Sequence, residues 1–172
     1  MRFRSKTQRM VLLGLLISMA IVLGYFERFI PLPWNVPGMK LGLANIITLS
    51  AFYFFDKKSV FALVVIRVVM TSLLVGSMMS FFYSIVGGLL SFLGMVVLFQ
   101  WFRRVVSPIG ISMTGALLHN VGQLSVLALI SGRLSIALSY APIIMISALA
   151  TGVFVGLASS FFVKSVPLTQ LR

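Results

Sequence analysis

Polar side chains that interrupt long apolar stretches are the residues of this sequence best placed for chemistry. Residues 115–124 carry His119, Asn120 and Gln123 among leucine, valine and glycine residues. His119 and Gln123 are four residues apart, so a helix would project them from one face. A group of this kind either forms hydrogen bonds between helices or lines a polar pocket, and we favour the pocket.

Arg67 is a second such position, because it lies within the apolar run of residues 63–70. Inserting a cation into a membrane helix costs at least ~2.5 kcal/mol, so we expect Arg67 to face a partner or a hydrated cavity. The two acidic residues of the sequence, Glu27 and Asp56, both lie near the ends of apolar runs. Arg67 therefore either bonds carbonyls and neutral side chains or binds an anionic ligand, and both alternatives stay open.

If their helices pack together, six polar side chains would converge on one substrate pocket: Lys40, Asn45, Arg67, His119, Asn120 and Gln123. A single histidine in a chain without cysteine does not supply a metal site, so we expect no metal and no cofactor. The sequence has no evident combination of nucleophile, base and acid, and we expect that the protein is not an enzyme.

The elements that carry these residues are membrane helices. Hydrophobic residues make up 60% of the 172 residues, charged residues 9%, and the mean hydropathy is +1.13, which is far above the values of soluble domains. We predict an all-α integral membrane protein, a bundle of six transmembrane helices in one membrane domain covering residues 1–172. The predicted helices are residues 10–30, 41–55, 59–75, 78–102, 107–130 and 136–163.

The distribution of charge predicts the orientation of the chain in the membrane. The formal net charge is +12, and the basic residues cluster before the first predicted helix and after the second, fourth and sixth. Basic clusters at alternate connections are typical of cytoplasmic loops. We therefore expect a multi-pass protein of the cell (plasma) membrane with cytoplasmic N and C termini, and we interpret the charge as anchoring to the lipid bilayer, with no nucleic acid as partner.

The outer connection at residues 31–40 contains three prolines, which stiffen it and prevent a continuing helix. A structured loop of this kind can act as a lid over a binding pocket, or it can be a simple connector. Small residues also recur at helix-packing spacing in the first predicted helix, as Gly14 with Ser18 and Ala20 with Gly24. Such pairs let helix backbones approach closely, either within the bundle or against a partner protein.

Three segments together resemble a known family in order and spacing: residues 37–46, residues 82–91, and residues 115–124 with their His-Asn-x-Gly-Gln-Leu ending. The family is that of the Gx transporter proteins, also labelled heptaprenyl diphosphate synthase component I. It is similar to the substrate-binding S components of energy-coupling factor (ECF) transporters. The resemblance covers most of the chain, from about residue 10 to residue 160.

The resemblance implies a six-helix S component whose substrate lies near the outer face beneath the loop between the first two helices. Residues 31–40, with Trp34 and Asn35, would form the lid. Small residues of the first helix would dock on a transmembrane coupling protein that two cytoplasmic ATPase subunits drive. This role would fall to the residues that form the two small pairs: Gly14, Ser18, Ala20 and Gly24.

We therefore expect a substrate-binding component of an uptake transporter for a small, anionic or amphipathic organic molecule, such as a vitamin or a precursor of quinones or isoprenoids. The alternative is a non-catalytic membrane subunit that assists polyprenyl diphosphate or quinone biosynthesis. Catalysis of prenyl transfer itself requires clustered carboxylates to hold magnesium against a diphosphate. The single aspartate, Asp56, cannot provide such a cluster.

Overall fold

The computed structural model describes residues 5–30, 40, 42–75, 77–102 and 104–166. Within these ranges the chain forms six α-helices and one 3-10 turn, η1, and it contains no strand. This confirms an all-α protein. The elements are α1 (Lys6–Phe26), η1 (Glu27–Phe29), α2 (Asn45–Phe54), α3 (Lys57–Val75), α4 (Met78–Trp101), α5 (Pro108–Ser131) and α6 (Leu134–Ser165).

Four of the helices in the described chain, α1, α4, α5 and α6, are long and apolar enough to cross a membrane. The prediction of six spans is therefore corrected. α2 has 10 residues, a length of about 15 Å, which is half of the ~30 Å hydrocarbon core. α3 has 19 residues but carries Lys57, Lys58 and Arg67.

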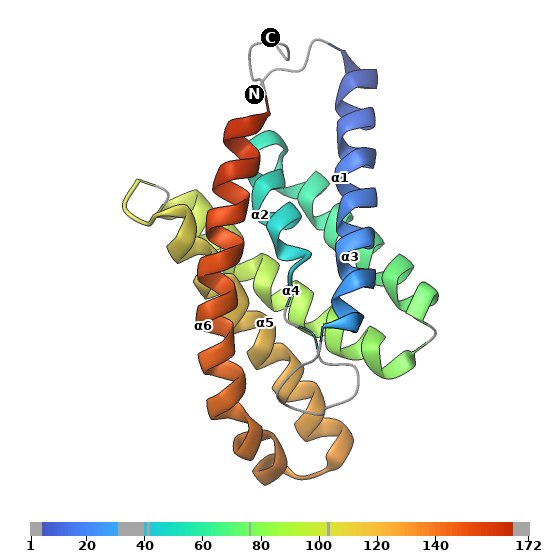
Figure 1. The fold of residues 1–172 in the computed structure, drawn as a ribbon, viewed down its shortest axis with the longest axis vertical. Coiled ribbons are helices and arrows are strands. Elements are labelled where there is room, and N and C mark those ends of the chain that lie inside the picture. Colours follow the sequence, from blue (N-terminus) through green and yellow to red (C-terminus); the bar gives the residue numbers. More distant parts are fainter. Residues whose placement is uncertain (1–4, 31–39, 41, 76, 103, 167–172) are drawn as a thin grey trace.

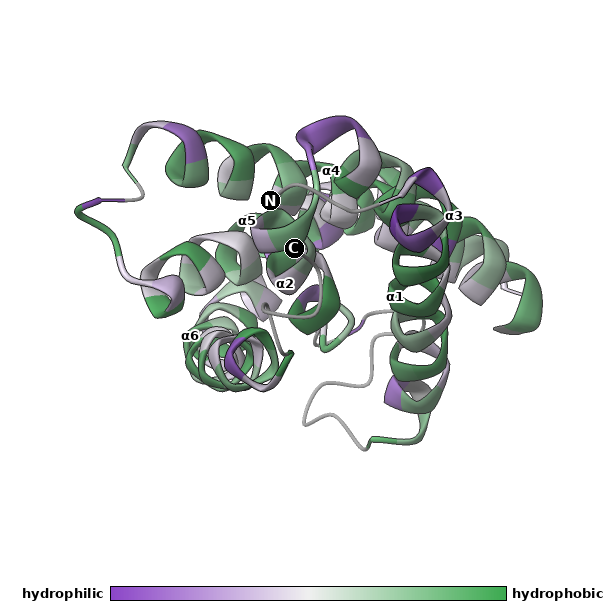
Figure 2. Ribbon diagram, turned by 90° about the horizontal axis from the view of Figure 1, so that it is seen from above, coloured by the Kyte–Doolittle hydropathy of each residue, from purple (hydrophilic) through white to green (hydrophobic). Residues whose placement is uncertain are grey.

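The two long terminal helices lie along the long axis of the molecule (Figure 1). The start of α1 and the end of α6 lie at the same end, and the α5–α6 connection lies at the other. α5 packs most extensively on α6 and α4, whereas α1 packs mainly on α3. Coloured by hydropathy, most of the helical ribbon is hydrophobic (Figure 2), as expected for a bundle whose helices contact lipid.

Local sequence signals explain several helix ends. The side chains of Ser77 and Ser107 accept hydrogen bonds from the backbone N–H groups three residues later, and they cap the starts of α4 and α5. Gly132 ends α5 in the left-handed region, at φ 65°, where a residue without Cβ is unstrained. The first helix is shifted from the predicted residues 10–30, because it begins at Lys6 and gives way to η1 at Glu27.

Glycines allow the helices that carry the polar residues to approach one another closely. A Cβ on Gly122 of α5 would lie 2.7 Å from the Cα of Gly87 on α4, and a Cβ on Gly87 would lie 2.8 Å from the backbone oxygen of His119. On the other side of α5, Gly152 and Gly156 of α6 leave the same kind of space for the α5 backbone. α5 is therefore held between two helices, and the position of His119 is fixed.

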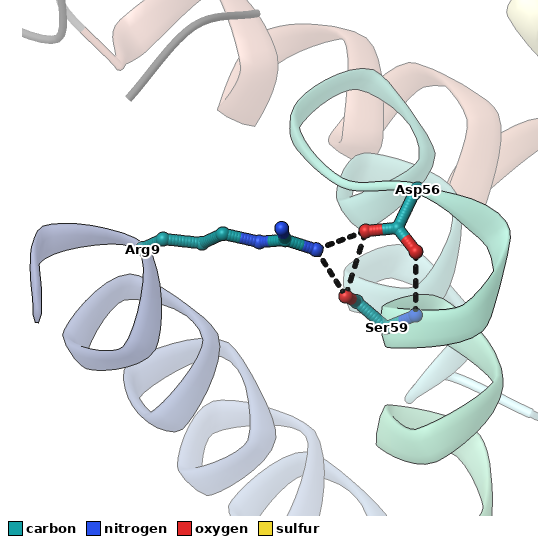
Figure 3. A network of polar contacts seen from close by, with 3 residues as sticks. All are labelled: Arg9, Asp56 and Ser59. Atoms are coloured by element: carbon teal, nitrogen blue, oxygen red, sulfur yellow. Dashed lines mark hydrogen bonds and ion pairs between the residues drawn. The ribbon is translucent and has the colours of Figure 1, made fainter. Parts of the chain in front are cut away.

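A polar cluster joins the start of α1 to the turn between α2 and α3 (Figure 3). Arg9 forms an ion pair with Asp56 and donates a hydrogen bond of 2.8 Å to Ser59 Oγ. Ser59 also donates to the Asp56 carboxylate, from Oγ at 2.9 Å and from its backbone N–H at 3.4 Å. Burial acts to raise the pKa of Asp56, but these hydrogen bonds and the charge of Arg9 outweigh it and hold the pKa below its usual value.

Candidate functional site

A small polar cavity lies where α1 and η1 meet α3, α4 and α5. Its volume is about 30 Å³, room for about two water molecules. Lys40 and Gly42, which precede α2, close one side of it. The polar residues on its wall are Glu27, Lys40, Arg67, Thr71, Ser84 and His119. A polar cavity enclosed by hydrophobic helices is the expected position of a binding site in a membrane protein.

Arg67 is the central cation of this site and is 5% exposed. Its Nη2 donates a hydrogen bond of 2.8 Å to Asn45 Oδ1, at the start of α2. Its Nε, also buried, has no hydrogen-bond partner. The bond to Asn45 fits the first alternative, in which Arg67 bonds neutral groups. The unsatisfied Nε fits the second alternative, in which Arg67 binds an anionic ligand.

Glu27 is the acidic residue of the site and is 4% exposed. Its carboxylate accepts a short hydrogen bond from the backbone N–H of Gly42. Gly42 has a φ of 86°, which is unstrained only without a Cβ, and a Cβ there would lie 3.0 Å from Asn45 Nδ2. The chain therefore turns tightly between Glu27 and Asn45.

Gln123 joins α5 to the segment that precedes α2. Its Oε1 accepts a hydrogen bond of 3.2 Å from the Lys40 N–H, and its Nε2 donates to the Lys40 carbonyl at 3.0 Å. The same Nε2 lies 2.6 Å from His119 Nε2. Because Gln123 is 1% exposed, its amide is a buried clamp on the backbone of Lys40, with His119 beside it.

The site carries more positive than negative charge. Burial lowers the pKa of the Lys40 ammonium, and the nearby charge of Glu27 opposes this effect. Glu27 interacts electrostatically with both Lys40 and Arg67. The described part of the chain has one ion pair within 4.0 Å, that of Arg9 with Asp56, so neither cation of the site forms a direct pair with Glu27. An anion placed between them would meet two cations and one carboxylate.

The structure brings together five of the six residues expected in the pocket: Lys40, Asn45, Arg67, His119 and Gln123. The sixth, Asn120, points elsewhere and donates a hydrogen bond of 3.2 Å to the Ile144 carbonyl on α6. Sequence reasoning missed Glu27 as a site residue. Its signal was present, because it is one of only two acidic residues and follows directly on an apolar helix.

The predicted lid residues Trp34 and Asn35 lie outside the described residues. The four residues predicted to dock on a partner separate into two pairs. Gly14 and Ser18 are exposed, and nothing lies within 4 Å of a Cβ built on Gly14. Ala20 and Gly24 are buried in the bundle, and a Cβ on Gly24 would lie 3.2 Å from Thr71 Oγ1. Their small size serves the packing of α1 on α3, so in this structure they offer no surface to a partner.

Fold and site together define a helical membrane protein with a small, predominantly cationic site buried among its helices. A family model named heptaprenyl diphosphate synthase component I matches residues 16–162. The chain belongs to this family, as the three sequence motifs indicated. No curated protein and no solved structure matches it.

Proposed function

We propose that the protein is the substrate-binding component of an ECF-type uptake transporter, and that it binds a small anionic or amphipathic organic molecule. The observation that carries the proposal is the buried Arg67, whose Nε has no partner at the wall of a cavity that also holds Lys40. A buried unsatisfied donor costs about 1–3 kcal/mol, and an anionic oxygen would remove this cost. Ser84 and His119 line the same cavity but are not hydrogen-bonded to each other, so the described site has no nucleophile paired with a base, which favours binding over catalysis.

In this proposal the Gln123 clamp on Lys40 is the contact that changes when substrate enters. The cavity of about 30 Å³ holds no more than a carboxylate-sized group, so a larger ligand enters only when its walls separate. Lys40 is the last residue of the proposed lid, 31–40, and α5 holds its backbone through one side chain. Loss of these two hydrogen bonds would free the lid at this end.

The remaining parts of the proposal concern topology and partners. The four long apolar helices would cross the plasma membrane, with α2 and α3 packed among them and both termini in the cytoplasm. The positive-inside pattern supports this orientation, because the basic residues near helix ends on the proposed cytoplasmic side include Lys6, Arg9, Lys57, Lys58, Arg104 and Lys164. The exposed Gly14–Ser18 face of α1 would dock on a coupling protein that two ATPases drive.

Native mass spectrometry of the purified protein tests the proposed pocket. Wild type is compared with Arg67→Ala and Gln123→Ala, and Asn120→Ala serves as a control because Asn120 bonds α6 instead of facing the cavity. We expect wild type and the control to retain a small molecule that the two site variants lose while their helical content holds. If the site variants retain the molecule as wild type does, the pocket assignment is wrong.

The family description favours one alternative, a non-catalytic membrane subunit of polyprenyl diphosphate or quinone biosynthesis. The same cations would bind a diphosphate. The chain itself lacks the carboxylates to hold magnesium, since its two acidic residues are Glu27 in the site and Asp56 beside Arg9. Affinity purification from membranes separates the two functions: ATPase and coupling subunits copurify in the first case, and a soluble prenyl synthase in the second.

A further inference from the structure

A second cavity lies between the end of α3 and the start of α4, and we call it the α3–α4 groove. Its volume is about 360 Å³, within the ~300–1,000 Å³ that small-molecule sites occupy. Its wall is mainly apolar and consists of Val69, Ser72, Leu73, Ser77, Met78 and Phe81. Leu73 and Met78 are 71% and 75% exposed, so the groove opens on the outside of the helix bundle.

Hydroxyl groups without hydrogen-bond partners connect this groove to the polar cavity. Ser72 lines the groove, Ser84 lines the cavity, and Ser80 lies one helical turn before Ser84 on the same face of α4. All three side chains are more than nine-tenths buried, and their Oγ atoms have no partner. On α3, Thr71 and Ser72 line the cavity and the groove from different faces of the helix. At the start of α4, Ser77 lines the groove, and Ser80 lies between it and Ser84 of the cavity along one face.

These hydroxyls differ from most serines in the helices of this protein. Ser50, Ser125, Ser139 and Ser147, for example, each donate to the carbonyl four residues earlier, at 2.7–2.9 Å. Ser72, Ser80 and Ser84 do not, although a hydroxyl buried without a partner is costly. Ser91 and Ser112 are also buried without a partner, but they line neither the cavity nor the groove. Ser72, Ser80 and Ser84 are the unsatisfied donors near both, where a ligand with oxygen acceptors near its charged end would satisfy them.

Resting on the function proposed above, we propose that the ligand is an anionic amphiphile: its charged head lies at Arg67 and Lys40, and its apolar tail lies in the α3–α4 groove. The polar cavity alone, at about 30 Å³, is too small for an organic molecule, whereas the groove has the volume and the apolar wall for a tail. The oxygens of the head would accept hydrogen bonds from Ser72, Ser80 and Ser84. The ligand would then enter sideways between α3 and α4, from the bilayer.

Photolabelling in phosphatidylcholine nanodiscs tests this placement. The probe is decanoate with a diazirine near the end of its chain, and the uncharged probe is the corresponding decanol. We expect the decanoate probe to label residues 69–81, unlabelled decanoate to compete, and the decanol probe to label these residues at least tenfold less. Equal labelling by the two probes would mean that the groove is an ordinary lipid contact and would overturn the proposal.

Two neighbouring leucines provide a matched pair of variants. Leu73 lines the groove, whereas Leu74 does not, and both side chains are exposed, at 71% and 60%. Leu73→Trp should fill the groove and reduce labelling about tenfold, whereas Leu74→Trp should leave it unchanged. Equal labelling of the two variants would place the tail elsewhere.

The link between head and tail is tested with Arg67→Met, which should also lose the labelling. If this variant does not fold, the double variant Ser72→Ala and Ser80→Ala replaces it, and we expect severalfold weaker labelling. If the decanoate probe still labels these variants as it labels wild type, the groove binds the probe without the polar cavity, and the proposal is overturned. One combined outcome separates the two proposals: Arg67→Ala loses the native ligand in mass spectrometry, but the decanoate probe does not label the groove. The proposed function would then stand, and only the placement of the tail in the groove would be wrong.

Discussion

Replacing Glu27 with glutamine should weaken the fold and strengthen anion binding at the same time. Glu27 is buried and accepts the Gly42 N–H, and a glutamine carbonyl can accept the same hydrogen bond. The substitution therefore keeps shape and hydrogen bonding but removes the one negative charge beside Lys40 and Arg67. Two buried cations would then have no counter-charge unless an anionic ligand supplies it.

The structure limits the size of both effects. Arg9–Asp56 is the one ion pair within 4.0 Å in the described chain. Lys40 and Arg67 therefore both lie more than 4.0 Å from the Glu27 carboxylate. At an effective dielectric constant of about 20, each lost attraction is then worth less than ~4 kcal/mol. We expect the free energy of unfolding to fall by about 1–4 kcal/mol. The substitution also removes the repulsion between the Glu27 carboxylate and a bound anion. Each ~1.4 kcal/mol of repulsion removed raises the affinity for the anion tenfold.

Thermal unfolding in detergent measures the first effect, and titration with decanoate measures the second. Asp56→Asn is the matched control, because it removes the only other negative side-chain charge at an exposed ion pair. Such pairs contribute about 0–1 kcal/mol, so the control should change stability little and decanoate affinity not at all. A Glu27→Gln protein with unchanged stability and unchanged or weaker decanoate binding would refute the reasoning.

Three further predictions concern packing, pH and docking. Gly122→Ala should destabilise the protein by about 1–3 kcal/mol in thermal unfolding, because its Cβ would lie 2.7 Å from Gly87 Cα. Gly14→Ala is the comparison, because Gly14 lies in a helix and nothing is within 4 Å of its Cβ position. The depressed pKa of Asp56 stabilises the fold above the unfolded value of ~3.9. The melting temperature should therefore fall as the pH drops through the lower folded pKa, and Asp56→Asn should remove that part of the fall. Gly14→Leu should leave melting unchanged but abolish copurification of the coupling protein; retained copurification would exclude this docking face.

The helix starts that the sequence predicted best are those with a clear capping residue. α4 and α5 begin beside Ser77 and Ser107, and both caps are visible as a serine before a long apolar run. The predicted number of spans was wrong because α3 carries three basic residues and because an apolar run, in the case of α2, does not reveal its helical length. Residues 41–55 include a turn through Gly42, so the helix begins only at Asn45 and is too short to cross.

The candidate site was predictable where a polar residue interrupts an apolar helix, as Arg67, His119 and Gln123 do. Glu27 was missed because its role depends on a tertiary contact with the turn at Gly42, 15 residues later in the chain. Asn120 is adjacent to His119, but successive residues of a helix face directions about 100° apart, and only packing decides which one meets the cavity. Packing also decides the role of Ala20 and Gly24, because their four-residue spacing does not predict whether they face the bundle or a partner protein.

The length of α6 has a consequence for how deeply the protein lies in its membrane. Its 32 residues give a helix of about 48 Å, longer than the ~30 Å hydrocarbon core and slightly longer than the ~40–45 Å of a whole bilayer. Arg133 directly precedes its first residue and Lys164 lies in its last turn, so in a membrane each end would hold a cation near the lipid headgroups. We therefore expect α6 to respond to the thickness of the bilayer. A thinner bilayer would tilt it, and α5, with His119 and Gln123, would have to follow because α6 packs along its length. We therefore expect the geometry of the polar cavity to depend on the thickness of the bilayer around the protein.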